Sequence, residues 1–377
     1  MLRYLKYYLK ELMAEFKMLS QGISYVFTGK KRAIYVGCLG MGNLGDEAVY
    51  IATKHLLKQK LFLYKVPYQK PFSGKLFRRY FFRPPDYIIL GGGTLVLKNA
   101  KESFLRIILG YKNKYPKAKL VVFGTGVADP ILAKQNGFPT NIEDWRTFFD
   151  LCEFVSVRGI LSKKLLEDKF EVIKKPIFIL HEPTIQFRRT KIIEKSKNKV
   201  IGINFCDIVG RIYGQDQEGL GLFFKNLVIA LLDQGWTVYL YPTVVSDIKF
   251  MKKQLGEELT RKILIYDNHK DLKKSLKFFE EIDVFIGQRL HSIVFSTITY
   301  TPFFAIEYES KMSDFLLTLG CKDKTMRTDL LDLGYLLNKI DSLYKNIEEE
   351  QKVLFDFCWK ASQQQLTFTE NFLNDRA

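Results

Sequence analysis

The sequence lacks any run of about 18 uninterrupted apolar residues, which a membrane-spanning helix would need. It also lacks a signal-peptide pattern, because charged residues interrupt the apolar positions throughout residues 1–28. Cysteine is scarce, and the five cysteines are scattered, odd in number and never in a metal-ligand spacing. We therefore expect a cytoplasmic protein with reduced cysteines, no metal site and no bound cofactor.

Acidic residues are outnumbered by basic ones, 41 to 58, which leaves a formal net charge of +17 on 377 residues. This excess favours anionic partners, namely nucleic acid, an anionic membrane surface or a phosphorylated small molecule. We expect no nucleic acid, because the sequence has neither an RNA-binding aromatic motif nor a recognisable helix-turn-helix. A phosphorylated substrate and a membrane surface fit the composition better.

The chain is too long for one compact core and suits two domains. Residues 31–190 and 196–325 each alternate short apolar strands with helices, which predicts a doubly wound parallel sheet in each. Apolar residues at three- and four-residue steps predict an amphipathic helix within residues 1–30. The segment 329–377 is expected to form a helical tail that packs back on the first domain. The predicted fold class is α/β, with two Rossmann-like domains facing across a cleft, as in two-domain glycosyltransferases.

Two glycine-rich turns follow predicted strands in the first domain. The turn Gly42–Ala48 lies between a strand at 33–38 and a helix at 49–58. It matches neither a Walker loop, since no Lys-Ser/Thr follows, nor a dinucleotide fingerprint, since no acidic strand end follows. The turn Gly91–Leu95 comes directly after the strand 86–90. Such turns let a backbone approach a ligand closely, at the edge where open α/β sheets bind ligands.

Polar side chains from both domains are expected to meet in the cleft. In the second domain Arg289 and His291 follow the strand 283–286, and Lys311 lies near the next strand end. Arginine binds carboxylate or phosphate through a planar fork, and histidine exchanges a proton near neutral pH. The first domain is expected to contribute Asn43, Asp46, Gly92, Gly93, Thr94 and Arg158.

Some of these residues also have a purely structural interpretation. Asp46 and Glu47 could serve only to cap the helix that follows them, and Arg158 could simply form an ion pair. The other three histidines are expected to be structural or exposed: His55, His181 and His269.

Four short motifs together resemble the signatures of the polysaccharide pyruvyltransferase family. They are Gly42–Ala48, Gly91–Leu95, Ser156–Arg158 and Arg289–His291, and their order and spacing are similar over about residues 33–320. The resemblance implies transfer of pyruvate from phosphoenolpyruvate to a sugar of a cell-surface polysaccharide or of its lipid-linked precursor. The product would be a pyruvate ketal bridging two sugar hydroxyls, with release of phosphate.

The resemblance also implies roles for individual residues. Arg158, Arg289 and His291 would bind the donor, and Asp46 would be a further active-site residue. We expect His291 to protonate C3 of phosphoenolpyruvate as a general acid, and Asp46 to act as base toward the sugar hydroxyl. The donor site is further expected to include Leu290, Asn43, Gly92, Gly93 and Thr94, with Lys311 as an additional candidate.

Three positions depart from the family pattern while leaving these groups in place. Gly159 stands where an acidic residue is common, Glu182-Pro183 replaces an Asp-Pro pair, and Gln288 stands where small or acidic residues are common. The departures bear on the acceptor and on the pairing of Arg158 more than on the donor.

Two other functions stay open at this point. One is a glycosyltransferase that uses a nucleotide sugar, with Arg289 and Lys311 holding the diphosphate. The other is a membrane-associated assembly component of a polysaccharide pathway, which would depend on residues 1–28. The basic amphipathic helix over that segment either packs on the protein body or lies on anionic lipid. The second interpretation would place the protein at the inner face of the cell membrane, near a lipid-linked acceptor.

Overall fold

The computed structural model describes most of the chain. The predicted helix over 1–28, apart from Met13, lies outside the described residues, as do His269 and nearly all of the basic, aromatic stretch 69–85. The described residues are 13, 29–40, 42–66, 84–97, 104–135, 137, 141–169, 173, 175–208, 211–268 and 270–373.

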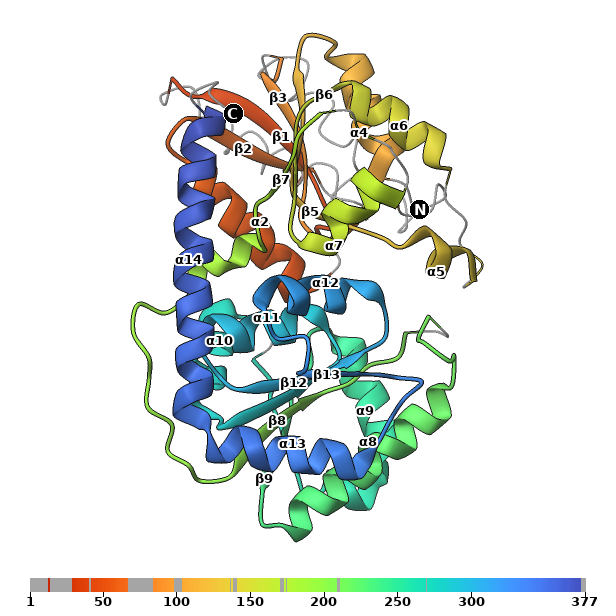
Figure 1. Cartoon of the computed structure of the whole chain (residues 1–377), viewed down its shortest axis with the longest axis vertical. Helices are drawn as coiled ribbons and strands as arrows, with labels where there is room; N and C mark the ends of the chain where they lie inside the picture. The colour runs from red at the N-terminus through yellow and green to blue at the C-terminus, as the bar shows by residue number, and fades with distance from the viewer. Residues whose placement is uncertain are drawn as a thin grey trace.

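The first sheet contains seven strands within these ranges, all of them parallel (Figure 1). Their order is β2-β1-β3-β5-β6-β7, with β4 paired to β5. The strands are short apolar runs buried on both faces, as parallel strands between helical layers require. They are β1 (Lys31–Val36), β2 (Leu61–Val66), β3 (Tyr87–Gly91), β4 (Thr94–Val96), β5 (Lys119–Val127), β6 (Cys152–Val157) and β7 (Ile177–Ile179). The helices are α2 (Leu44–Leu57), α4 (Phe104–Lys114), α5 (Pro130–Gln135), α6 (Ile142–Asp150) and α7 (Ile160–Lys164), which continues as the π-helix η2 (Leu165–Lys169).

The second sheet contains six parallel strands in the described part of the chain, in the order β10-β9-β8-β11-β12-β13. The strands are β8 (Val200–Asn204), β9 (Thr237–Leu240), β10 (Leu264–Ile265), β11 (Val284–Gly287), β12 (Phe303–Glu307) and β13 (Thr325–Arg327). The helices are α8 (Gln217–Asp233), α9 (Val245–Thr260), α10 (Leu272–Glu281), α11 (Leu290–Ile298), α12 (Ser310–Leu319), α13 (Leu333–Lys345) and α14 (Ile347–Leu373). The short helix η3 (Pro183–Phe187) precedes this domain.

Each sheet is covered by helices on both faces. In the first domain α4 and α6 pack on one face of the sheet, where Ile108 and Trp145 join its core. In the second domain α8, α9 and α13 cover one face and α10, α11 and α12 the other. Two parallel sheets, each with helices on both sides, confirm the predicted α/β class.

The C-terminal helices contact both domains. Helix α13 packs on the second sheet, and α14 runs from the second domain to the first (Figure 1). Leu354 and Cys358 lie in the core of the second domain. Near the other end of α14, Phe372 packs against Tyr87 and Phe123 of the first domain. The tail thus joins the domains instead of resting on the first alone.

None of the described helices combines the length and apolarity that crossing a bilayer requires. All five cysteines fall in described ranges, and none of them forms a disulfide.

Candidate active site between the two domains

A pocket of about 330 Å³ lies between the two domains. Residues that follow the carboxyl ends of strands line it, among them Thr94 after β3, Arg158 after β6, Arg289 after β11 and Tyr308 after β12. The strands of both sheets therefore direct polar side chains into one space. The predicted site residues that line it are Asn43, Asp46, Gly93, Thr94, Arg158, Arg289, Leu290, His291 and Lys311.

Gly92, also predicted to bind the donor, lies behind the pocket wall. A Cβ at this position would come 2.6 Å from the Tyr35 hydroxyl and 2.7 Å from Val49 Cγ1. The residue also has a φ of +72°, a conformation that favours glycine. Gly92 thus packs the turn onto β1 and α2, while Gly93 faces the pocket.

The first turn of α2 forms one wall. Asn43 caps this helix, because its side-chain oxygen accepts a hydrogen bond from the Gly45 amide at 3.0 Å. Glu47 is engaged elsewhere: one oxygen accepts from the Gly40 amide at 2.9 Å and the other pairs with Lys65 at 3.0 Å. Asp46 borders the pocket beside the second glycine turn.

Arg158 is buried at the base of the pocket, with 3% of its surface exposed. Its Nη2 donates to Thr94 Oγ1 at 2.7 Å, and its Nη1 lies 3.6 Å from Glu182 Oε2. Gly126 lies against the guanidinium, where a Cβ would come 2.7 Å from Cζ. Glu182, one of the three departures from the family pattern, is thus the ion partner of Arg158.

Glu182 is itself almost fully buried, and neither of its carboxyl oxygens has a hydrogen-bond donor in the described structure. Burial raises the pKa of Glu182 to about 7, and the nearby Arg158 only partly offsets this rise. The Glu182 carboxyl can therefore gain or lose a proton near neutral pH.

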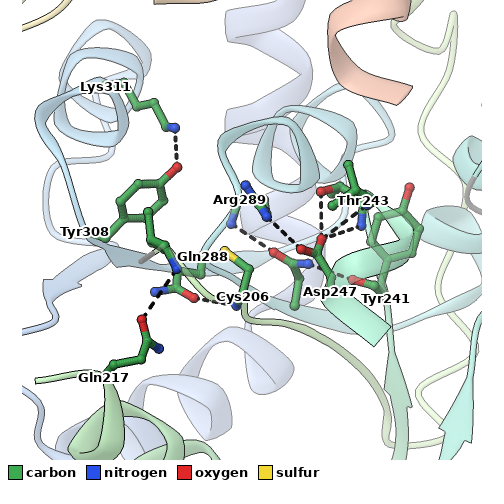
Figure 2. Close-up of polar contacts among 12 residues, drawn as sticks. Cys206, Gln217, Tyr241, Thr243, Asp247, Gln288, Arg289, Tyr308 and Lys311 are labelled. Carbon is green, nitrogen blue, oxygen red and sulfur yellow. Dashed lines mark hydrogen bonds and ion pairs between the residues drawn. The ribbon is translucent and has the colours of Figure 1, made fainter. Parts of the chain in front are cut away.

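Arg289 is held by Asn204 at the end of β8 and by Asp247 in the first turn of α9 (Figure 2). Its backbone amide donates to Asn204 Oδ1 at 2.9 Å, and its Nη2 donates to Asp247 Oδ1 at 2.7 Å. The other Asp247 oxygen accepts from the amide and the hydroxyl of Thr243, each at 3.0 Å, and from the Val244 amide at 3.2 Å. Asp247 therefore caps α9 and fixes the guanidinium at the same time.

Sequence reasoning missed Asp247. The available signal was its third position in a helix that begins just after β9, where an acidic side chain reaches back to the helix start.

Gln288 and Lys311 flank this group. Gln288 is buried, and its Oε1 accepts from the Cys206 amide at 2.7 Å, which ties the loop after β8 to β11 (Figure 2). Lys311 reaches the pocket from α12 and contacts both the Tyr308 hydroxyl and the Glu309 carboxylate. Gln288 thus supports the scaffold, whereas Lys311 adds a third cation to the pocket.

His291 lies in the first turn of α11 and packs directly on Gly45 of the facing domain. Burial lowers the pKa of His291 to about 3, and the positive charges of Arg158 and Lys311 add to this effect. The imidazole is therefore neutral near pH 7. The predicted role of His291 as a general acid would require a ligand whose negative charge raises this pKa.

Part of the remaining lining comes from segments to which sequence reasoning assigned no role. Helix α5 and the residues just before it form one side, and the loop after β8 forms the other. This part is largely apolar, with one acidic and one basic residue. It comprises Ala128, Asp129, Leu132, Ala133, Ile208 and Arg211.

The remaining histidines in the described ranges do not line the pocket. His181 Nε2 lies 2.6 Å from Gln364 Oε1, and the His181 ring meets Phe357 edge-on. His55 is exposed near the end of α2. In the described part of the chain no three His, Cys, Asp or Glu residues are arranged to hold a metal ion.

Fold and pocket together define a two-domain α/β protein with a cationic site at facing strand ends. The model of the polysaccharide pyruvyl transferase family matches residues 43–310, and the chain belongs to this family. The match spans the four motifs, from the α2 turn to Arg289–His291, and leaves out only Gly42.

A curated relative and two solved structures extend this comparison. The chain is 25% identical over 171 residues to the amylovoran biosynthesis protein AmsJ of Erwinia amylovora, and the match covers 43% of this chain and 41% of that protein. A protein from Listeria monocytogenes, described as a UDP-N-acetylglucosamine 2-epimerase, has a similar fold with a TM-score of 0.55 at 11% identity, covering 87% of this chain and 91% of that one. A glycosyltransferase from Rickettsia africae gives 0.51 at 10% identity, over 92% and 99% of the two chains. The two structures bear on the fold alone.

Proposed function

We propose that the protein transfers pyruvate from phosphoenolpyruvate to a sugar of a cell-surface polysaccharide or of its lipid-linked precursor, forming a pyruvate ketal. The observation that carries the proposal is the placement of Arg158, Arg289 and Lys311 around His291 in one pocket of a pyruvyl transferase family member. The donor has two anionic groups, a carboxylate and a phosphate, and a pocket with several cations suits it.

The two arginines take the two anionic ends of the donor. Arg158 is anchored by Thr94 and Glu182 in the first domain, and Arg289 by Asp247 in the second. Because both guanidinium groups are fixed before the donor arrives, little ordering is left for binding. Lys311 then stabilises the phosphate as it departs.

His291 supplies the proton that makes C2 of the donor electrophilic. Negative charge on the bound donor offsets Arg158 and Lys311, so the pKa of His291 rises on binding and the imidazolium forms. Transfer of its proton to C3 forms the new methyl group and leaves positive charge at C2. A sugar hydroxyl then bonds to C2 and passes its proton to Asp46.

Ketal closure completes the balance of atoms. The C2–O bond to phosphate breaks, a second hydroxyl bonds to C2, and the phosphate takes up one of the two hydroxyl protons. The other hydroxyl proton returns from Asp46 to His291, so both groups end as they began. The reaction needs no cofactor, since phosphoenolpyruvate is a substrate.

The acceptor sugar binds against the part of the pocket lined by α5 and the loop after β8. A sugar ring presents apolar C–H faces and polar hydroxyls, which suit a lining of apolar side chains with Asp129 and Arg211. We further propose that the protein is cytoplasmic and contacts anionic lipid at the inner face of the membrane. Flotation with anionic vesicles at low salt tests this contact, which fails if all the protein stays in the soluble fraction.

The direct test is incubation with phosphoenolpyruvate and a panel of galactose, mannose and N-acetylmannosamine acceptors, free and lipid-linked. We expect phosphate release that depends on the acceptor, together with an acceptor that has gained a pyruvate ketal by mass spectrometry. Phosphate release from no member of the panel would count against the proposal.

A nucleotide-sugar glycosyltransferase is the second candidate, since the fold resembles that of a glycosyltransferase. Binding of a nucleoside diphosphate sugar, with no binding of phosphoenolpyruvate, would favour it.

A further inference from the structure

The start of one helix meets the side of another across the boundary between the domains beside the pocket. Helix α7 of the first domain begins against α12 of the second (Figure 1). Gly159 occupies the N-cap position of α7 and has no side chain to satisfy the free amides of the first turn. The partners of these amides must therefore come from elsewhere.

The second domain supplies them. Asp314 Oδ1 accepts from the amides of Leu161 and Ser162 at 2.8 and 3.1 Å, and Asp314 Oδ2 accepts from the Ser162 hydroxyl at 2.6 Å. The Ile160 amide donates to Thr318 Oγ1 at 3.0 Å. A carboxylate and a hydroxyl of α12 thus cap a helix of the other domain.

The contact leaves no room for a side chain at position 159. A Cβ there would come 2.2 Å from Asp314 Oδ1, so the carboxylate fills the space that a cap residue of α7 would use. Asp314 is 3% exposed, and hydrogen bonds to a buried, charged acceptor are among the stronger ones. Separating the domains would expose the three amides and the carboxylate together.

This contact lies between two cations of the pocket. Arg158 is separated from α7 by Gly159 alone, and Lys311 is one helical turn before Asp314 on α12. The position of α7 relative to α12 therefore sets the position of Arg158 relative to Lys311 and His291.

We propose that Asp314 is a positioning residue that holds the two domains at the separation at which the donor pocket is complete. Its role for the donor rests on the proposed function. Its role in domain spacing does not, because the hydrogen bonds join residues of the chain itself.

The decisive comparison uses Asp314→Ala and the double variant Gly159→Asp/Asp314→Ala. Residue 159 has φ −152° and ψ 170°, an extended conformation that aspartate adopts, and removal of the Asp314 carboxylate frees the space. The double variant restores a cap to α7 within its own domain, without the tie to α12. Asp332→Ala is the matched control, since Asp332 caps α13 through the Tyr335 amide within the second domain.

We expect Asp314→Ala to weaken binding of phosphoenolpyruvate at least tenfold in calorimetry and to increase the radius of gyration in X-ray scattering. The double variant should regain thermal stability while its donor affinity and radius stay altered. Asp332→Ala should lose stability and keep both wild-type affinity and radius.

Return of wild-type affinity and radius in the double variant would overturn the proposal, because capping alone would then explain Asp314. An unchanged radius in Asp314→Ala would overturn it as well. If the wild-type protein binds no phosphoenolpyruvate, the proposed function fails, and the scattering of the variants still decides the role of Asp314.

Discussion

Gly45 and His291 come from different domains and lie in direct contact. A Cβ on Gly45 would come 2.1 Å from His291 Cγ and 2.2 Å from Nδ1. Gly45→Ala must therefore displace the imidazole or separate the domains. We expect a loss of at least 100-fold in kcat, and on the order of 1–3 kcal/mol of stability from overpacking. Steady-state kinetics and thermal unfolding measure both.

The matched control is Gly334→Ala in the first turn of α13. There an added Cβ meets only Asp332 Oδ1, at an ordinary distance of 3.5 Å. This variant should keep full activity and unfold at the same or a higher temperature. Unchanged activity in Gly45→Ala would mean that the ring position is not critical.

The substitution Asp247→Asn tests the contact with Arg289 while it keeps the cap of α9. One oxygen of Asp247 accepts from three donors at the start of α9, so the amide oxygen of asparagine should stay there. The amide nitrogen would then face Arg289 Nη2, donor against donor. We expect KM for phosphoenolpyruvate to rise tenfold or more with little change in melting temperature. Asp271→Asn, at the N-cap of α10, is the control and should change neither. A KM for Asp247→Asn equal to that of the control would contradict the role of Asp247.

Binding of phosphoenolpyruvate should take up a proton at His291. The pKa of His291 is about 3, held down by burial, Arg158 and Lys311, and we expect the anionic donor to raise it. Calorimetry near pH 6.5 in buffers of different ionisation enthalpy measures the uptake. His291→Gln cannot titrate, so the uptake by the wild-type protein minus that by the variant isolates His291. An equal uptake by both proteins would show that His291 stays neutral in the complex.

Glu182 should make the protein less stable as the pH rises. Its pKa is about 7 in the folded protein and 4.5 when free, so between these values the folded state holds the proton more tightly. Stability from this group is complete below pH 4.5 and declines as the pH rises through 7. Glu182→Gln lacks this dependence, so its melting temperature relative to wild type should increase between pH 5 and pH 8. A difference that is constant over this range would contradict the raised pKa.

Much of the fold and part of the pocket could be predicted because their signals are local. Arg289 and His291 follow an apolar strand, and parallel strands end at one edge of a sheet, so their meeting Arg158 could be expected. The sequence could not show that Gly93 lines the pocket and Gly92 does not. Which face of a glycine turn meets the pocket depends on the residues that pack against the other face. Here Gly92 faces Tyr35.

The sequence alone could not predict which residues from distant parts of the chain are in contact. Asp247 is 42 residues from Arg289, and Asp314 is 153 residues from Leu161. No local pattern connects such pairs. The pKa of His291 was unpredictable for the same reason, since it depends on burial between the domains and on Arg158 in the other domain. The departure from the family pattern at Gly159 is explained only by the structure, in which the Asp314 carboxylate fills the space that a side chain at position 159 would need.

Within the described ranges the chain passes between the domains twice, through the linker near 188–199 and through α14. Both passages lie on the same side of the molecule, on the left in Figure 1, whereas α5 lies on the opposite side. A hinge motion about these two passages would separate the domains most at α5. For the proposed polysaccharide acceptor, such an opening would let a long polymer enter sideways, without threading a free end into the pocket. An internal sugar of the polymer would then be as accessible as a terminal one.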